Sequence, residues 1–242
     1  MKIAGADLSY TSPGIVIEEL DEYFNITGLY RHGFTTTVKK YADCEGIVSC
    51  KFTDFDHIYF RYNEFNENIL EWTKDCEYVA VEDYAISKSG EQGRIFNLAE
   101  FEGFIKQTLF RAGKKLRFYT PNQNKKIFAG YGNADKIGMR DALLKKNAEH
   151  DYGDILLNID DLPPVLKGKE GAKPTSDIID AFSLAESLRL ELALRAGTLS
   201  LNDISPEARE VYTNKAKHKN PKTKKVTINP SLLEMPFLCL YK

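Results

Sequence analysis

The sequence predicts a mixed α/β fold in which strands dominate the first half of the chain and helices the second. Three observations support this class. Short runs rich in Val, Ile, Tyr and Phe recur early in the chain, as is typical of strands. A helical pattern separates two such runs between residues 77 and 120, which indicates a strand, helix, strand unit. Two further helical patterns follow after residue 134.

Six segments have the length and composition of strands, and turn-rich pieces separate them. They are 2–6, 14–19, 23–30, 58–62, 77–83 and 116–120. The first of them, KIAGA, is apolar and ends directly before Asp7, after which small and hydroxyl residues follow. An aspartate at the end of a buried strand needs an explanation.

Three segments show helical spacing of apolar residues. The first covers 94–113 and ends with Gly113, where a helix C-cap is expected. The others cover 134–149 and 176–196. The proline- and glycine-rich residues between these two helices predict a loop at 150–174, and 197–242 is predicted to be a weakly structured extension.

Several classes of protein are excluded by composition. The chain of 242 residues contains no stretch near the roughly 18 apolar residues of a membrane span, and Asp7 interrupts the apolar run that a signal peptide needs. We therefore expect a cytoplasmic protein without a membrane partner. Its four cysteines form no C-x-x-C pair and its four histidines have no ligand spacing to them, which argues against a zinc site or a disulfide framework.

The net charge of −2 hides an uneven distribution. Residues 111–146 have a net charge of +8, and residues 196–242 have a net charge of +4, including the run KAKHKNPKTKK at 215–225. Such runs are either solvated surface or contacts for nucleic acid. The basic residues of the first region are Arg111, Lys114, Lys115, Arg117, Lys125, Lys126, Lys136, Arg140, Lys145 and Lys146.

Four acids stand at the ends of predicted elements. Asp7 follows the first strand, Glu82 lies near the end of the strand 77–83, and Asp177 and Asp180 open the last helix three residues apart, on one face. If that helix packs across the strands, these carboxylates converge. Carboxylates buried close together either take up protons or recruit cations, and Mg²⁺ prefers such oxygen ligands. Two such ions support phosphodiester hydrolysis.

Each acid taken alone also has a structural interpretation. Asp177 is favoured near the positive end of a helix dipole, and Glu82 could face solvent on an edge strand. Asp7 is the hardest to explain this way, because the run before it is apolar and small residues after it leave room for a ligand.

Four motifs, GADLSYTSPG, VAVEDYA, KKIFAGYGNADK and SDIIDAFSLAESL, occur in this order along the chain. In their order and spacing the sequence resembles the RuvC-like Holliday junction resolvases of the ribonuclease H-like superfamily. The resemblance covers roughly residues 2–20 and 77–195. It implies a ribonuclease H-like fold with a central mixed five-stranded sheet flanked by helices.

The resemblance also implies how the chain is divided. Residues 1–196 correspond to the nuclease domain, with longer segments than a compact bacterial member at about 31–76 and at 150–174. The basic residues 197–242 have no counterpart and form a C-terminal extension.

By this resemblance Asp7, Glu82, Asp177 and Asp180 are the catalytic acids and bind two Mg²⁺ ions, for which Mn²⁺ substitutes. The implied enzyme is a metal-dependent endodeoxyribonuclease that resolves four-way junctions, with Asp7 bridging the metals. Lys125 and Lys136 match basic positions that hold DNA near the scissile phosphate, and Tyr84 follows the glutamate where the family carries a junction-opening aromatic. The expected DNA-binding set is Lys114, Lys115, Arg117, Lys125, Lys126, Lys136 and Tyr84.

A four-way junction has approximate twofold symmetry and needs two opposed cuts, so a homodimer is expected. The helix 94–113 is the candidate interface, because Phe96, Phe101, Phe104 and Phe110 are spread around it beyond one core stripe. The divergence suggests a bacteriophage origin, in which case the protein acts in the host cell cytoplasm.

Three alternatives stay open from the sequence. The same fold and acids could act on flaps, other branched DNA or RNA–DNA hybrids. The segment DLSYTSPG loosely resembles the phosphate-binding turn of sugar-kinase and actin-like ATPases, although such proteins have a duplicated domain. The chain could also bind DNA without cleaving it, although all four acids are retained.

Overall fold

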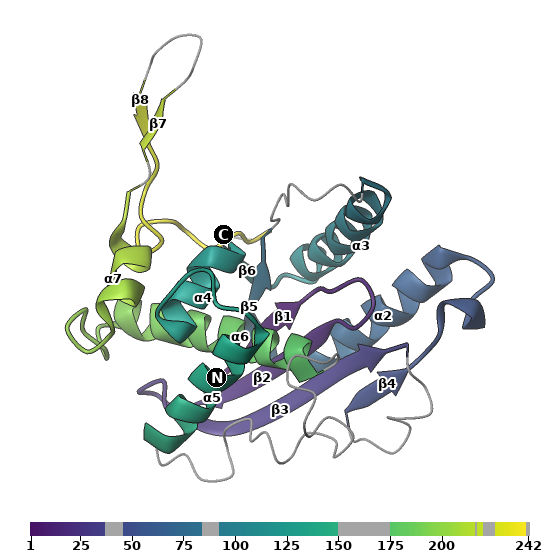
Figure 1. The fold of residues 1–242 in the computed structure, drawn as a ribbon, viewed down its shortest axis with the longest axis horizontal. Helices are drawn as coiled ribbons and strands as arrows, with labels where there is room; N and C mark the ends of the chain where they lie inside the picture. Colours follow the sequence, from purple (N-terminus) through teal and green to yellow (C-terminus); the bar gives the residue numbers. More distant parts are fainter. Residues whose placement is uncertain (37–45, 84–91, 150–174, 216, 220–225, 241–242) are drawn as a thin grey trace.

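A six-stranded mixed sheet runs through the centre of the molecule (Figure 1). The computed structural model describes residues 1–36, 46–83, 92–149, 175–215, 217–219 and 226–240. The strand order is β4-β3-β2-β1-β5-β6. The strands are β1 (Lys2–Asp7), β2 (Gly14–Leu20), β3 (Ile26–Thr35), β4 (Ile47–Ser49), β5 (Cys76–Glu82) and β6 (Lys115–Tyr119).

The first three strands form an antiparallel meander, and β5 and β6 continue the sheet parallel to β1. The short β4 pairs in parallel with β3. The predicted mixed sheet of five strands flanked by helices is confirmed, with the three residues of β4 added at one edge.

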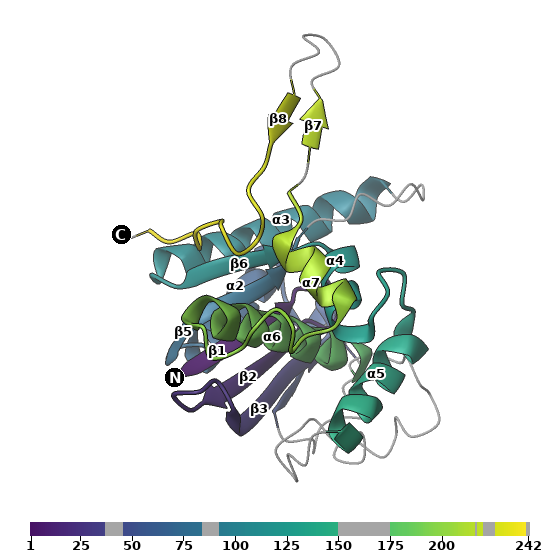
Figure 2. The ribbon, with the colours of Figure 1, turned by 90° about the vertical axis from the view of Figure 1, so that its left-hand side faces the viewer.

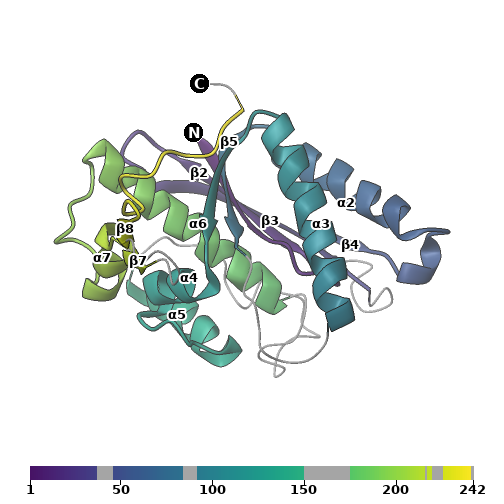
Figure 3. The same ribbon diagram turned by 90° about the horizontal axis from the view of Figure 1, so that it is seen from above.

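Helices cover both faces of the sheet. Seen from above (Figure 3), α2 and α3 lie on one side of the strands and α4, α5 and α6 on the other. Figure 2 shows α6 lying across the strands. The helices of the described residues are α2 (Ile58–Trp72), α3 (Gln92–Arg111), α4 (Pro121–Ala129), α5 (Lys136–Glu149), α6 (Thr175–Ala196) and α7 (Pro206–Thr213), with a short 3-10 turn, η1 (Phe52–Asp54).

Alternation along the strands sorts their side chains between two hydrophobic cores. In β1, Ile3 packs into the core beneath α6, whereas Ala4 and Ala6 pack into the core beneath α2 and α3. Residues two apart in a strand share a face. Asp7 therefore lies on the same face of the sheet as Ile3, toward α6.

Two glycines let α6 come unusually close to the sheet. A Cβ atom at Gly5 would lie 2.1 Å from the carbonyl oxygen of Ala181, and one at Gly14 would lie 2.6 Å from that of Asp177. Both distances are far below a normal contact with backbone, so these two positions exclude every other residue at the present spacing. The glycines fix the first turns of α6 directly over the β1–β2 hairpin.

The segment 58–62, predicted to be a strand, is the start of α2. Tyr62, Phe65 and Ile69 are buried at spacings of three and four residues, which is the pattern of a helix. The five-residue window IYFRY was too short to show this period. The predicted strand 23–30 also begins later, at Ile26, and continues to Thr35.

The three predicted helices are confirmed as α3, α5 and α6, and Gly113 has the positive φ of +78° expected after a helix end. Two further helices were missed. Thr120 caps α4 in a capping box with Gln123, and Ser205 caps α7.

The extension after residue 196 is not weakly structured in the described residues. Helix α7 buries Ala208, Val211 and Tyr212, and β7 (Lys217–Lys219) pairs with β8 (Val226–Ile228) in an antiparallel hairpin. Residues 231–238 then run back over the body of the protein and end beside β6, through a backbone pair between Leu116 and Leu238. We call residues 231–238 the C-terminal strap.

Of the two segments predicted to be longer than in the family, 31–76 contains the end of β3, β4, η1 and α2. The predicted loop 150–174 lies outside the described residues. None of the helices in the described part of the chain is long and apolar enough to cross a membrane.

Candidate active site

The sheet places two of the four predicted acids side by side. Strands β1 and β5 are parallel, and their register pairs Ala6 with Val81. The next residues on each strand are Asp7 and Glu82. Both lie on the face toward α6, because Ile3 and Ala80 on the same alternation pack into the core beneath that helix.

Helix α6 brings the other two acids to the same place. Its first turns lie over the β1–β2 hairpin, and carboxylate oxygens of Asp7, Asp177 and Asp180 lie within 4.8 Å of one another. Asp7 and Asp177 are buried, and the side chain of Asp180 is 16% exposed. The Ser12 hydroxyl, buried in the loop after β1, donates a hydrogen bond to Asp177. The predicted convergence of the helix acids with the strand acid is confirmed.

The electrostatics of this cluster are unfavourable without a cation. Burial, followed by the charges of Asp177, Glu82 and Asp180, raises the pKa of Asp7 well above its usual value. Burial and then Asp180 raise the pKa of Glu82 to about 7. Glu82 thus interacts electrostatically with Asp7 and Asp180, although its carboxylate is not within the 4.8 Å group.

One lysine partly compensates these charges. The Lys136 ammonium, at the start of α5, donates to Asp180 and lies 3.9 Å from the Asp177 carboxylate. Burial disfavours its charged form, but Asp180, Asp177 and Asp7 together raise the pKa of Lys136. A single ammonium cannot balance four carboxylates.

The donor set fits a hard divalent cation. All four side chains offer carboxylate oxygens, and the described residues bring neither histidine nor cysteine into the cluster. Oxygen ligands of this kind suit Mg²⁺ or Mn²⁺ rather than zinc. The cluster can therefore hold metal ions, and binding them would remove the repulsion that raises the carboxyl pKa values.

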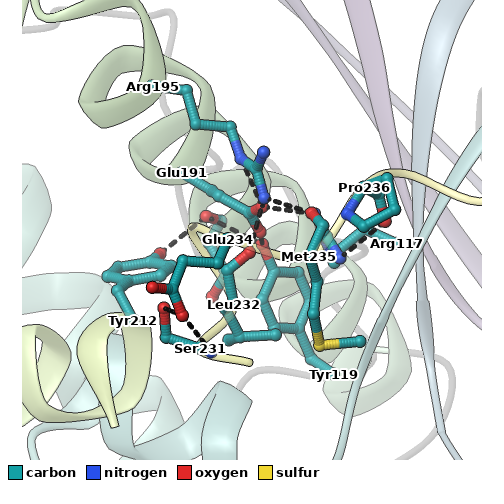
Figure 4. Close-up of polar contacts among 11 residues, drawn as sticks. Arg117, Tyr119, Glu191, Arg195, Tyr212, Ser231, Leu232, Glu234, Met235 and Pro236 are labelled. Carbon is teal, nitrogen blue, oxygen red and sulfur yellow. Dashed lines mark hydrogen bonds and ion pairs between the residues drawn. The ribbon is translucent and has the colours of Figure 1, made fainter. Parts of the chain in front are cut away.

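Two residues of the predicted DNA-binding set are buried parts of the fold. Lys114 is 8% exposed and donates to the carbonyl oxygens of Lys74 and Cys76, at 2.7 and 2.9 Å. Arg117 is 3% exposed and donates to Glu191 at 2.6 Å (Figure 4). Both cations are held by internal partners in this structure, which does not favour their predicted role as phosphate contacts.

Lys115 lies at the wrong end of the sheet for the same role. Its ammonium pairs with Glu77 at 2.6 Å. In the parallel register of β5 and β6 it stands beside Tyr78, at the start of these strands, whereas Glu82 stands beside Tyr119 at their ends. Four strand residues span about 13 Å. Lys115 does not join the acids.

Lys136 and Lys125 do lie near the carboxylates, and the charge of Lys125 lowers the pKa of Glu82, which opposes the effect of burial. Lys126 on α4 forms an ion pair with Glu210 on α7 at 2.7 Å. Tyr84 lies outside the described residues, so its predicted role stays a prediction.

Ser12 is a part of the site that the sequence did not reveal. It was visible only as one of several hydroxyl residues after Asp7, and its partner Asp177 is 165 positions away. Gly14 was visible as a turn residue, but its importance for the approach of α6 depends on a contact that the sequence does not show.

No protein-family model and no curated protein sequence matches the chain. Among solved structures, it is similar to Thermus thermophilus RuvC in complex with Holliday junction substrate, with a TM-score of 0.53, 22% identity, and coverage of 82% of this chain and 97% of that chain. The fowlpox virus resolvase in complex with Holliday junction DNA is more distant, with a TM-score of 0.46, 16% identity, and coverage of 79% and 99%. The likeness to RuvC shows that the chain has the RuvC-like, ribonuclease H-like fold predicted from its motifs.

Proposed function

We propose that this protein is a metal-dependent endodeoxyribonuclease that resolves four-way DNA junctions. The observation that carries the proposal is the cluster of buried carboxylates from β1 and α6, with oxygens of Asp7, Asp177 and Asp180 within 4.8 Å. Glu82 on the neighbouring strand adds a fourth acid whose pKa is raised to about 7. Buried acids held together against their repulsion favour a catalytic role over a structural one.

Asp7, Glu82, Asp177 and Asp180 would hold two Mg²⁺ or Mn²⁺ ions. Asp7 would contribute to both, as the resemblance to the family implies, and its place beside Glu82 in the sheet and among the oxygens of Asp177 and Asp180 supports this role. Bound there, divalent ions polarise a phosphate and lower the pKa of an attacking water. Ser12 would keep the Asp177 carboxylate oriented through its hydrogen bond.

Lys136 would have two partners in turn. Without metal it neutralises Asp180. With divalent cations held by the carboxylates, the Lys136 ammonium would be free to bind a phosphate oxygen of the DNA near the scissile bond. Its side chain is 44% exposed, so a phosphate can approach it. Lys125 would bind a phosphate group of the same DNA strand, next to the one that Lys136 binds.

The choice of a four-way junction as substrate rests on the likeness to RuvC, whose matched structure contains a Holliday junction substrate. Flaps, other branched DNA and RNA–DNA hybrids are the alternative substrates of the same site. The experiment below separates them.

Cleavage of a labelled synthetic four-way junction in Mg²⁺ or Mn²⁺ tests the proposal, beside linear duplex, flap and RNA–DNA hybrid at equal concentration. The variant Glu82→Gln removes one acid of the site. The matched control Glu77→Gln lies on the same strand at the opposite end and is 52% exposed. We expect paired symmetric nicks from the wild type and the control, and none from Glu82→Gln.

Other outcomes overturn the proposal in part or in whole. Preferential cleavage of flaps or hybrids, still dependent on Glu82, would keep the catalytic site and replace the substrate. Equal cleavage by Glu82→Gln would remove Glu82 from the site. Absence of cleavage on every substrate with either metal would refute the nuclease itself.

Two opposed cuts in one junction imply a homodimer, and its face would be an aromatic patch on α2 and α3. Tyr59 and Phe60 are 56% and 62% exposed, and Phe96 and Phe104 are 72% and 42% exposed. Tyr59 donates to Glu100, which joins the two helices. Phe101, also expected at the interface, is buried in the core instead.

Sedimentation velocity at micromolar concentration tests the dimer. We expect a dimer for the wild type and a monomer for Phe96→Ser combined with Phe104→Ser. A wild-type monomer would contradict the proposed dimer.

A further inference from the structure

Arg61 of α2 is a charged side chain in the core that α2 and α3 cover. It is fully buried, and among the described residues its Nε and Nη1 atoms have no hydrogen-bond partner. Burial lowers the pKa of Arg61, and the groups that oppose this shift are a thiol and two phenols, Cys50, Tyr10 and Tyr62. A buried cation without an acid beside it is costly, so Arg61 needs an explanation other than packing.

Aromatic rings surround the guanidinium in place of a counter-charge. Its central carbon lies 3.9 Å from the ring centroid of Phe52, 4.2 Å from that of Phe65 and 5.4 Å from that of Tyr10. We call these three rings the aromatic cage. The faces of such rings attract a cation, which offsets part of the cost of burial. An apolar side chain of similar length would also fill the cage, so the rings alone do not explain a cation.

The guanidinium of Arg61 reaches the loop that joins β1 to β2, residues 8–13. Its Nη2 atom donates to the Tyr10 carbonyl oxygen at 3.0 Å. The Tyr10 ring also packs edge-on against Tyr62 and Phe101, with ring centroids 6.4 and 6.0 Å apart. Backbone and side chain of the β1–β2 loop are therefore both attached to the helices on this side of the sheet.

The same loop touches the carboxylate cluster on the other side of the sheet. Helices α2 and α6 lie on opposite sides of the strands (Figure 3). Two residues after Tyr10, the buried Ser12 donates its hydroxyl to Asp177 at the start of α6. A single residue, Thr11, separates the two attachment points. A shift of the Tyr10 backbone would therefore move Ser12 away from its partner.

From this geometry we propose that Arg61 is a positioning residue of the carboxylate cluster. By holding the β1–β2 loop from the opposite side of the sheet, it keeps the Ser12 hydroxyl on Asp177 and so aims that carboxylate at Asp7 and Asp180. A guanidinium suits this task, because its planar face stacks on aromatic rings while its edge donates to an oxygen. The inference rests on the proposed function only in taking a divalent cation as the ligand of the cluster.

A double-mutant cycle, read as Mn²⁺ affinity by titration calorimetry without DNA, tests the proposal. Arg61→Met fills the aromatic cage but removes the donor to the loop. Ser12→Ala removes the hydrogen bond to Asp177, and each change should lower Mn²⁺ affinity about tenfold, as loss of a partner behind a metal ligand does. The double variant should bind no more weakly than Ser12→Ala alone, because Arg61 acts through Ser12.

The matched control is Arg209→Met. Arg209 on α7 is half-buried and donates to the Leu201 carbonyl oxygen at 2.7 Å, so it holds the backbone of another loop in the same way. It should keep the Mn²⁺ affinity of the wild type. Hydrogen exchange of the metal-free proteins gives a second readout. Amides of the β1–β2 loop should exchange faster in Arg61→Met than in the wild type, and at the wild-type rate in Arg209→Met.

Four results decide the proposal. Additive losses of Mn²⁺ affinity would overturn it, and so would a lowered melting temperature with wild-type affinity. If Arg61→Met does not fold, Arg61→Lys, which keeps a cation but not the planar group, replaces it in the same cycle. If the wild type binds no Mn²⁺, the metal site of the proposed function fails, and unchanged exchange of the loop in Arg61→Met would then overturn the positioning role too. Faster exchange would keep it.

Discussion

The two ends of helix α6 bury acids in opposite ways. At its start, Asp177 and Asp180 join Asp7, and among the described residues Lys136 is their close counter-charge. About four turns later, Glu191 is fully buried with Arg117 and Arg195 as ion-pair partners. The second cluster is neutralised from within the chain, whereas the first carries an excess of negative charge. The excess marks the end at which the cluster could hold a cation.

Glu18 is another buried acid and faces the same helix. Neither of its carboxylate oxygens has a hydrogen-bond partner. Burial, and then Glu186, raise its pKa well above the usual value, while Arg189 and Lys146 oppose the shift. Its acidic neighbour Glu186 is itself paired with Arg189 and Lys146, so we assign Glu18 no part in catalysis.

The largest expected effect is at the neutralised end. Glu191→Leu leaves Arg117 buried without its counter-charge, which should lower the free energy of unfolding by about 3–5 kcal/mol. Chemical denaturation measures this. The control Glu210→Gln breaks an exposed pair with Lys126 and should cost less than about 1 kcal/mol. If Glu191→Leu and Glu210→Gln lower the free energy of unfolding by the same small amount, the ion pairs of Glu191 with Arg117 and Arg195 do not stabilise the fold.

The end with the Asp7 cluster should respond with the opposite sign. Asp7→Asn removes one of the repelling charges, so in EDTA the free energy of unfolding should rise by about 0.5–2 kcal/mol, as at other strained functional sites. The increase in melting temperature that Mg²⁺ produces in the wild type should disappear. Asp141→Asn, at a 64% exposed side chain of α5, is the control. A destabilised Asp7→Asn protein would indicate a structural aspartate.

The effect at Glu18 depends on pH and is the smallest over any one pH unit. Its pKa is raised in the folded state, so the folded protein holds this proton more tightly than the unfolded chain. The resulting stabilisation is complete below the ordinary pKa of 4.5 and is lost as the pH rises through the folded-state pKa. The Glu18→Gln variant should therefore gain stability over the wild type with rising pH, by at most about 1.4 kcal/mol per pH unit.

Chemical denaturation of both proteins from pH 4.5 to 8 measures this difference. Glu19→Gln, on the same strand and 43% exposed, is the control. Its free energy of unfolding should differ from that of the wild type by the same amount at every pH. If the difference in free energy of unfolding between Glu18→Gln and the wild type is also the same at every pH, the pKa of the Glu18 carboxyl is not raised in the folded protein.

The sequence predicted the acids better than the cations. Asp7, Glu82 and the α6 pair could be found because each interrupts an apolar pattern at an element end. Arg117 and Lys114 could not be separated from surface cations, because burial depends on partners far along the chain. Glu191, the partner of Arg117, is 74 positions away.

The fold was predictable where periodicity ran long enough. Helix α6 has 22 residues, enough to show the helical period of its apolar residues, and it was predicted. The start of α2, residues 58–62, was considered alone, and five aromatic-rich residues resemble a strand. The caps of α4 and α7 were visible in the sequence as Thr120 and Ser205, each followed by a proline at the first helical position. The strap could not be predicted, because its contacts are with arginine side chains of other elements.

The pair between Leu116 and Leu238 closes one edge of the sheet. Strand β6 is an edge strand, and the amide of Leu116 donates to the strap at 2.8 Å while its carbonyl oxygen accepts from the strap at 3.0 Å. Unpaired edges invite strands from other molecules, which leads to aggregation. This edge stays open during translation until residue 238 has left the ribosome. Nascent chains and C-terminally truncated products should therefore depend on chaperones more than the finished protein does.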